Sequence, residues 1–321
     1  MINEHSIIEL AKASFPEYIG DDAAVLPYTT QSKYLLSKDL LIEDVHFRTS
    51  YFTPYDLAHK SLNVNLSDIS AMGAKPTFVM LAASVPKNLL QYAVKFLQSF
   101  NQLCKEKNII LIGGDTTAGD KLCISVTAIG IADNNHIKLR STAQPEEIIC
   151  VIGNLGFSYL GLNILENHNA QNISLNSEIL NASLRPNALI NEGIWLGKQN
   201  AVTSMMDISD GLYVDLQKLC QASNIGAEIE VEKLQLKQSF ITQCATLNMD
   251  PITTALLGGE DYALLVTIDA SKYQEIATNF YTNFGYKMTD IGKINQTKKV
   301  IFTKNQQQLV HLDIKTFSHF E

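Results

Sequence analysis

Residues 60–76 read KSLNVNLSDISAMGAKP and mark a change from helix to strand, from which the rest of the chain can be ordered. Upstream, residues 53–56 (TPYD) supply a helix N-cap, a first-turn proline and the acid of a capping box. The helix is expected to end at Met72, because Gly73 follows it and a proline lies just beyond. A buried strand is then predicted over residues 77–85.

Three polar residues of this helix, Ser61, Asn65 and Asp68, recur at positions i, i+4 and i+7. They therefore share one face of a helix that is otherwise rich in apolar residues. An aspartate inside such a helix is unfavourable unless it has a partner. This pattern predicts a functional role for Asp68.

The sequence on both sides alternates between strand-like and helix-like patterns. Before the linker at 140–147, an extended segment begins at Tyr34 and ends at Ser37-Lys38-Asp39, strands are predicted over 77–85, 109–112 and 124–131, and a helix over 89–104. After it, strands are predicted over 148–152, 202–206, 227–231 and 262–268, helices from 158 and over 212–222 and 273–284, and a strand pair over 288–294 and 300–303. The alternation predicts an α/β (α+β) protein of two domains, 1–140 and 141–321.

Composition excludes several classes of protein. The chain has 321 residues and a net charge of −8, which argues against general nucleic-acid binding. Its apolar runs, such as 78–85, are far shorter than the ~20 residues of a membrane helix. The five cysteines are scattered and form no C-x-x-C pair, which is typical of free thiols in a reducing cytoplasm. We therefore expect a cytoplasmic protein without nucleic-acid or membrane partners.

Short acidic motifs lie along the chain, most of them where an apolar run stops beside Gly or Ser. They are Gly20-Asp21-Asp22, Lys38-Asp39, Asn65-Leu66-Ser67-Asp68, Gly113-Gly114-Asp115-Thr116 and Asp207-Ile208-Ser209-Asp210-Gly211. Taken singly, most are explained as surface turns or helix caps. If they converge, their carboxylates repel one another unless cations neutralise them. The set therefore predicts one site that holds several metal ions.

The same motifs favour phosphoryl transfer. Mg²⁺ binds through one or two carboxylates together with waters and phosphate oxygens, so several ions can bridge an acidic pocket to phosphates. Arg140 is the best-placed cation for a triphosphate, and Gly258-Gly259-Glu260-Asp261 repeats the pattern of glycine pair and acid. His46, taken alone, is more typical of a packed core histidine. The Walker A, dinucleotide-binding, G-x-S-x-G and H-E-x-x-H motifs are absent from the sequence.

In their order along the chain, these motifs resemble the thiamine-monophosphate kinase family, which belongs to the superfamily of aminoimidazole ribonucleotide synthetase. The resemblance covers nearly the whole chain. Its segments are 19–24 (IGDDAA), 44–47 (DVHF), 60–76, 113–117 (GGDTT), 140–141 (RS), 208–212 (ISDGL) and 258–262 (GGEDY).

The resemblance implies transfer of the γ-phosphoryl group of ATP to thiamine monophosphate, with several Mg²⁺ ions and no catalytic side chain. It also implies a homodimer that pairs through an amino-terminal mixed sheet with helices, and a carboxy-terminal α/β domain that completes the site. The implied metal positions are Asp22, Ser37, Lys38, Asp39, Asp68, Asp115, Asp207 and Asp210. The implied ATP contacts are Gly114, Asp115, Arg140 and Ser209, and the implied contacts to thiamine monophosphate are His46, Glu260 and Phe317.

Lys38 departs from the family, which usually has threonine at this metal position. The alternative is that Lys38 neutralises a phosphate or an empty carboxylate. Two other functions stay open: another ATP-using member of the superfamily, such as a ribonucleotide cyclo-ligase or a hydrogenase-maturation protein, and a non-catalytic acidic protein that binds divalent cations or a nucleotide. A selenophosphate-synthesising role is disfavoured because the first hundred residues contain no cysteine.

Overall fold

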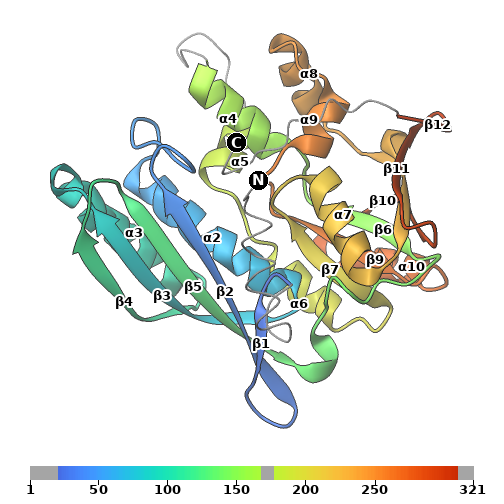
Figure 1. Cartoon of the computed structure of the whole chain (residues 1–321), viewed down its shortest axis with the longest axis horizontal. Helices are drawn as coiled ribbons and strands as arrows, with labels where there is room; N and C mark the ends of the chain where they lie inside the picture. Colours follow the sequence, from blue (N-terminus) through green and yellow to red (C-terminus); the bar gives the residue numbers. More distant parts are fainter. Residues whose placement is uncertain (1–20, 168–176, 310–321) are drawn as a thin grey trace, which may run out of the picture.

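Two β-sheets, each formed by its own half of the chain, organise the computed structural model, which describes residues 21–167 and 177–309 (Figure 1). The predicted two-domain α/β architecture is confirmed. The amino-terminal sheet has the order β1-β2-β5-β3-β4 and is mixed, because β3 and β4 are parallel while the other pairs are antiparallel. Its strands are β1 (Ala24–Pro27), β2 (Ser32–Ile42), β3 (Lys75–Val85), β4 (Ile110–Ala118) and β5 (Cys123–Asp133).

Helices α2 (Pro54–Ala71) and α3 (Leu90–Glu106) belong to this half. The predicted capping box at the start of α2 is present, because Thr53 and Asp56 bond each other's backbone N–H groups. Leu57, Leu62 and Ile69 of α2 are fully buried, and each such side chain stabilises the fold by roughly 1.5–3 kcal/mol. Burial alternates along β5, so one sheet face packs on the helices and the other is open.

Two acidic motifs lie inside strands rather than at strand ends, contrary to expectation. β2 continues through Lys38 and Asp39 to Ile42. β4 continues through Gly113-Gly114-Asp115 as a parallel edge strand beside β3. The glycine pair fits there because Gly113 has open space and a Cβ on Gly114 would lie 1.7 Å from the Leu81 carbonyl oxygen. Gly114 of a pair that resembled a turn therefore allows a close contact between strands.

The carboxy-terminal sheet has the order β12-β11-β8-β10-β6-β9-β7. Its strands are β6 (Ile148–Ile152), β7 (Val202–Ile208), β8 (Gly226–Glu230), β9 (Ala263–Ile268), β10 (Thr289–Asn295), β11 (Val300–Lys304) and β12 (Gln307–Gln308). The predicted pairing of the last two long strands is wrong: β8 lies between them, antiparallel to β10 and parallel to β11. The predicted linker, and with it the boundary at 140/141, falls between the two sheets.

Helices pack around this second sheet. They are α4 (Phe157–Asn167), α5 (Ser177–Leu184), α6 (Ile190–Gly197), α7 (Leu212–Ser223), α8 (Gln238–Thr246), α9 (Pro251–Leu257) and α10 (Tyr273–Phe284). Short 3₁₀ turns cover Lys87–Leu89, Asn134–His136 and Val231–Lys233. In the described ranges, no helix has the length and apolar character needed to cross a membrane.

The two halves meet along α2, which runs through the middle of the molecule toward α6 and β7 (Figure 1). Gly193 of α6 allows a close approach, because a Cβ there would lie 2.2 Å from the Ser70 carbonyl oxygen of α2. This contact holds the end of α2 against the carboxy-terminal half of the chain.

Candidate active site

Three carboxylates from distant parts of the chain converge where the two halves meet. Asp22 precedes β1, Asp68 lies on α2 and Asp207 lies near the end of β7. Each offers one oxygen, and these oxygens lie within 4.8 Å of one another. We call Asp22, Asp68 and Asp207 the carboxylate cluster.

Hydrogen bonds hold the cluster and its surroundings. Ser67 Oγ donates to Asp207 Oδ2 over 2.5 Å, and so links α2 to β7. On β2, the Asp39 N–H donates to Asn65 Oδ1 over 3.0 Å, and Ser37 Oγ donates to the Asn65 carbonyl oxygen over 3.3 Å. Asn65, which belongs to the polar face predicted on α2, therefore organises a strand of its own sheet. Ser67, a neighbouring residue of the helix, binds a strand of the other half.

Arg140 brings positive charge to the cluster. Its guanidinium pairs with Asp22 and, over 3.4 Å, with Asp21, while its backbone N–H also donates to Asp21. The carbonyl oxygen of Arg140 accepts from Ser223 Oγ over 2.8 Å. The segment between the halves is thus fixed on both sides, with the predicted ATP-binding arginine facing the predicted metal ligands.

Burial makes the ionised form of these carboxylates costly. Burial, reinforced by Asp215 and Asp39, raises the pKa of Asp207 to about 7 although a hydrogen bond from Ser67 lowers it. Burial and the neighbouring Glu260 raise the pKa of Asp39 to about 6. For Asp22 and Asp68, burial and neighbouring aspartates raise the pKa well above the ordinary range. Each carboxylate therefore favours a proton or a cation as its neighbour.

The donor set fits Mg²⁺. Among the described residues, Asp22 Oδ2 is buried without a hydrogen-bond partner, which is unusual for a buried carboxylate oxygen. Mg²⁺ prefers hard oxygen donors of this kind and commonly binds through one or two carboxylates. Ser37 and Asp39 face the same side of β2 as the cluster, so five of the predicted metal residues (Asp22, Ser37, Asp39, Asp68 and Asp207) gather in one region.

Lys38, by contrast, lies on the other side of β2. Its side chain is exposed and its Nζ donates to Thr127 Oγ1 over 3.4 Å, on the open face of the sheet. Ser37 and Asp39, its neighbours in the strand, point toward α2, because alternate residues of a strand face opposite ways. Within one chain, the Lys38 side chain therefore does not join the carboxylate cluster.

Asp115, together with its predicted ATP-binding neighbour Gly114, is also apart from the cluster. Asp115 on β4 pairs with Ala82 on β3, Ala82 pairs with Ser125 on β5, and Ser125 pairs with Leu40 on β2. Three strand spacings, or about 14 Å, therefore separate Asp115 from β2. Asp210, just before α7, is more than half exposed and pairs with Lys218 in the middle of that helix. The metal roles of Lys38, Asp115 and Asp210 stay predictions.

The predicted substrate contacts His46 and Glu260 are joined by a residue that the sequence did not single out. Lys60 Nζ donates to the His46 carbonyl oxygen over 3.1 Å and lies 2.8 Å from Glu260 Oε1. Ser209, predicted to contact ATP, accepts the Glu260 N–H through its carbonyl oxygen over 2.7 Å. Phe317 lies outside the described residues.

Two further buried aspartates shape the surrounding loops: Asp215, which sequence reasoning missed, and Asp261, which it named only as part of a glycine-rich motif. Asp215 accepts the N–H groups of Ser209 and Asp210 over 2.9 Å each, and so fixes the turn before α7. Asp261 accepts the Ser158 N–H over 3.0 Å at the start of α4. Burial raises the pKa of Asp261 to about 7. The capping role of Asp261 is invisible in the local sequence because Ser158 lies about a hundred residues earlier in the chain.

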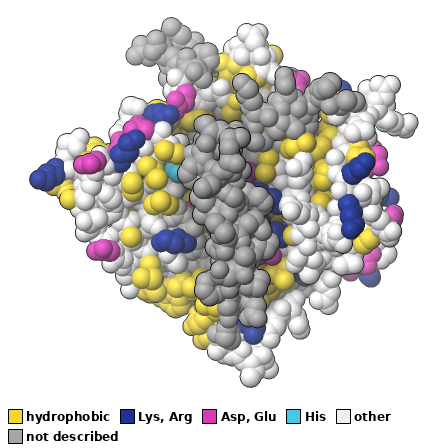
Figure 2. Space-filling view, in the orientation of Figure 1, with side chains coloured by type: hydrophobic (Ala, Val, Ile, Leu, Met, Phe, Trp, Pro, Cys, Tyr) yellow, Lys and Arg dark blue, Asp and Glu magenta, His cyan; other side chains and the backbone are white. Residues whose placement is uncertain are grey.

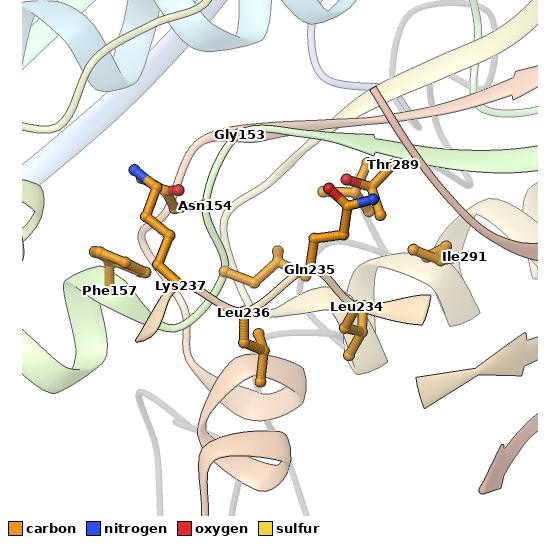
Figure 3. Close-up of a pocket in the computed structure, with 11 residues that line it drawn as sticks. Gly153, Asn154, Phe157, Leu234, Gln235, Leu236, Lys237, Thr289 and Ile291 are labelled. Carbon is orange, nitrogen blue, oxygen red and sulfur yellow. The ribbon is translucent and has the colours of Figure 1, made fainter. Parts of the chain in front are cut away.

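The hollow drawn in Figure 3 is lined by none of the predicted site residues. It lies between the turn at Gly153 and Asn154 and the segment from Leu234 to Lys237. Its cavity volume of about 20 Å³ has room for roughly one water. This hollow is therefore separate from the carboxylate cluster.

Comparison with protein families defines the class. The model described as "AIR synthase related protein, N-terminal domain" matches residues 20–132, and "AIR synthase related protein, C-terminal domain" matches residues 144–305. Each half of the fold therefore corresponds to one domain of the AIR synthase-related proteins, and the carboxylate cluster takes residues from both.

Similarity to individual relatives is more specific. Thiamine-monophosphate kinase from Buchnera aphidicola subsp. Schizaphis graminum is 33% identical over 303 residues, which cover 94% of this chain and 92% of the relative. The Bacillus subtilis protein of the same name is 33% identical over 310 residues, with 94% and 93% covered. The solved structure of AaThiL complexed with AMPPCP and TMP has a TM-score of 0.87 and 30% identity, covering 99% of this chain and 97% of that one. The chain belongs to the thiamine-monophosphate kinase family.

Proposed function

We propose that the protein transfers the γ-phosphoryl group of ATP to thiamine monophosphate and so forms thiamine diphosphate. The observation that carries the proposal is the carboxylate cluster, built from both halves at positions expected to bind Mg²⁺. The full-length similarity to thiamine-monophosphate kinases and to AaThiL complexed with AMPPCP and TMP supports it.

Asp22, Ser37, Asp39, Asp68 and Asp207 are the residues proposed to hold Mg²⁺. When bound, Mg²⁺ neutralises phosphate charge and helps to orient the transferred group. Arg140 adds a guanidinium already fixed beside Asp22, and Ser209 is the further proposed contact to ATP. No general base is required, because the second pKa of a phosphate monoester is near ~6 and the acceptor is therefore largely dianionic at pH 7.

A homodimer is the second part of the proposal. The open side of the amino-terminal sheet, here called the outer sheet face, exposes Leu40, Met80, Ile110 and Ile112 by 43–55%. Figure 2 shows hydrophobic side chains gathered over this half of the molecule. An apolar surface of this kind is typical of an interface between protein chains. We propose that a second copy of the chain covers it.

The dimer also gives Asp115 a place in the reaction. Asp115 lies on the outer sheet face, too far from the carboxylate cluster of its own chain to share a metal ion with it. A second copy seated on this face is the means proposed to bring Asp115 and Gly114 to the cluster of its partner. Lys38 lies on the same face and would join the same interface.

We further propose that the two sheets mark separate domains, divided at residue 140/141, and that the protein works in the cytoplasm. All five cysteines are free, and four of them are buried, as expected of a chain in a reducing compartment.

The direct test is incubation of the purified protein with ATP, Mg²⁺ and thiamine monophosphate, followed by chromatographic detection of thiamine diphosphate. Formation of thiamine diphosphate with an equal amount of ADP is expected. Hydrolysis of ATP without this product would instead support another ATP-using member of the superfamily. Binding of Mg²⁺ or ATP without turnover would support a non-catalytic protein.

A further inference from the structure

Lys60 is an almost fully buried lysine, 1% exposed, at the junction of the two halves. Its ammonium group lies 3.0 and 2.8 Å from the two carboxylate oxygens of Glu260 and 3.1 Å from the His46 carbonyl oxygen. It also lies over the ring of Phe52, 5.5 Å from its centroid. A buried ammonium is costly unless it is paired and hydrogen-bonded, so these contacts determine where the side chain lies.

Glu260 needs such a partner. Its backbone has a φ of +63°, a left-handed conformation that is strained for glutamate and persists only where the surroundings enforce it. The ion pair to Lys60 and the bond from its N–H to the Ser209 carbonyl oxygen supply two such constraints. The Glu260 side chain is 30% exposed whereas that of Lys60 is 2% exposed. The carboxylate of Glu260 is therefore accessible to a ligand, whereas the ammonium group of Lys60 is enclosed behind it.

The position of Lys60 on α2 connects this contact to the carboxylate cluster. Lys60 and Ser67 are seven residues apart, so they share one helix face and are separated by about 10 Å along the axis. Ser67 bonds Asp207, and Lys60 bonds Glu260. One rigid helix thereby contacts the carboxy-terminal half at the proposed metal site and again at the proposed acceptor site.

We propose that Lys60 is the positioning residue of the acceptor site: it holds Glu260 and the His46 carbonyl at a fixed distance from the carboxylate cluster, and so determines how thiamine monophosphate binds. The proposal rests on the proposed function. Lys60 is not a catalytic residue in this account, because its ammonium is enclosed by protein groups. It acts through Glu260.

The test compares Lys60→Met, which keeps the length of the side chain and removes its charge, with the wild-type protein. The KM for thiamine monophosphate is expected to rise at least 10-fold, while the KM for ATP changes less than 2-fold. Lys138→Met is the matched control: Lys138 is also buried, 6% exposed, and donates to the Gln199 carbonyl oxygen over 2.9 Å. This control is expected to leave both KM values unchanged.

Glu260→Gln and the double variant Lys60→Met/Glu260→Gln complete a cycle that shows whether the two residues act together. If Lys60 acts through Glu260, the double variant has about the same KM for thiamine monophosphate as Glu260→Gln alone. Calorimetric titration of each variant with thiamine monophosphate alone should rank their affinities in the same order as the KM values. If Lys60→Met does not fold, Lys60→Arg takes its place: the charge is kept but its distance to Glu260 changes, so the KM for thiamine monophosphate is expected to rise while the KM for ATP changes less than 2-fold, and an unchanged KM for thiamine monophosphate would overturn the inference.

Three results would overturn the inference: an unchanged KM for thiamine monophosphate in Lys60→Met, equal increases in both KM values, or multiplicative effects in the double variant. None of them affects the proposed function, which fails only if the wild-type protein forms no thiamine diphosphate. In that case the calorimetric cycle, with thiamine monophosphate as the probe, still decides whether Lys60 and Glu260 bind it as a unit.

Discussion

Ser67 Oγ donates a 2.5 Å hydrogen bond to Asp207 Oδ2 and thereby connects the central helix α2 to the end of strand β7 in the other half of the protein. Ser67 and Asp207 are both 1% exposed. The bond fixes one carboxylate of the proposed metal site relative to its neighbour Asp68 on α2. It thus relates the packing of the two halves directly to the geometry of the site.

Removal of this bond should weaken both folding and metal binding. Ser67→Ala leaves a buried carboxylate without its donor, and the loss is expected to be ~1–3 kcal/mol of unfolding free energy. Denaturant unfolding and a Mg²⁺ titration measure the two effects. Ser204→Ala on β7 is the matched control, because Ser204 Oγ is buried without a hydrogen-bond partner among the described residues. Equal losses in both variants would contradict the role of Ser67.

Asp68→Asn should abolish turnover while the fold stays intact. The substitution replaces one carboxyl group of the carboxylate cluster by an amide of the same size, which cannot become a carboxylate ligand, so the expected loss of kcat/KM is at least ~100-fold. Steady-state kinetics measure the loss, and circular dichroism checks the fold. Asp133→Asn, at an exposed aspartate, should be close to wild type. Activity of Asp68→Asn near the wild-type level would refute a shared metal site.

Stability should depend on pH and Mg²⁺ together. The folded-state pKa values of Asp39 and Asp207 are raised from 3.8 to about 6 and about 7, so the folded chain binds more protons than the unfolded chain between those values. Their contribution to stability therefore falls as pH rises from about 4 to about 7. Mg²⁺ binds the ionised carboxylates and should stabilise the protein more at pH 8 than at pH 5.

Thermal unfolding in EDTA and in Mg²⁺, at pH 5 and pH 8, measures this linkage. The increase in Tm caused by Mg²⁺ should be several degrees larger at pH 8, and Asp207→Asn should reduce the difference. An increase of the same size at both pH values would be inconsistent with raised carboxylate pKa values at the metal site.

The outer sheet face should form the dimer interface. Met80→Lys introduces a charge on this face and is expected to shift the protein toward monomer in sedimentation experiments. Leu97→Lys on α3 is the control, because Leu97 and Met80 are both 43% exposed. If Leu97→Lys dissociates the protein and Met80→Lys does not, the interface lies elsewhere.

Mixing two inactive variants tests whether Asp115 acts in the partner's site. Asp68→Asn and Asp115→Asn each remove one contribution to every site of a homodimer. In a mixed dimer, one of the two sites keeps both aspartates. Random exchange of subunits is therefore expected to restore about a quarter of the wild-type activity, since half of the dimers are mixed and half of their sites are intact. No recovery in mixtures shown to have exchanged subunits would argue against a shared site.

Sequence reasoning succeeded where the chemistry is local. The capping box at Thr53 and Asp56 and the polar face around Asp68 follow from residues within a few turns of one helix. Strand ends were harder to place. β2 continues past Asp39 to Ile42. The strand was predicted to end earlier because Lys38, which is exposed on the open side of the sheet, resembles the beginning of a loop in the sequence.

Contacts between distant segments left no pattern to find. Lys60 and Glu260 are two hundred residues apart and meet only because α2 packs against the other half. Asp261 looked like part of a glycine-rich turn, but it caps α4, whose first residues lie about a hundred positions earlier. The separation of Asp115 from the carboxylate cluster became evident only from the order of the strands.

Transfer of label from [γ-³²P]ATP to thiamine monophosphate tests the central claim most directly. With Mg²⁺ present, the wild-type protein is predicted to place the label in the terminal phosphate of thiamine diphosphate, one label per ADP formed, and Asp68→Asn is predicted to transfer none. Label recovered only as inorganic phosphate, or transfer that persists in EDTA, would contradict Mg²⁺-assisted phosphorylation of thiamine monophosphate by the carboxylate cluster.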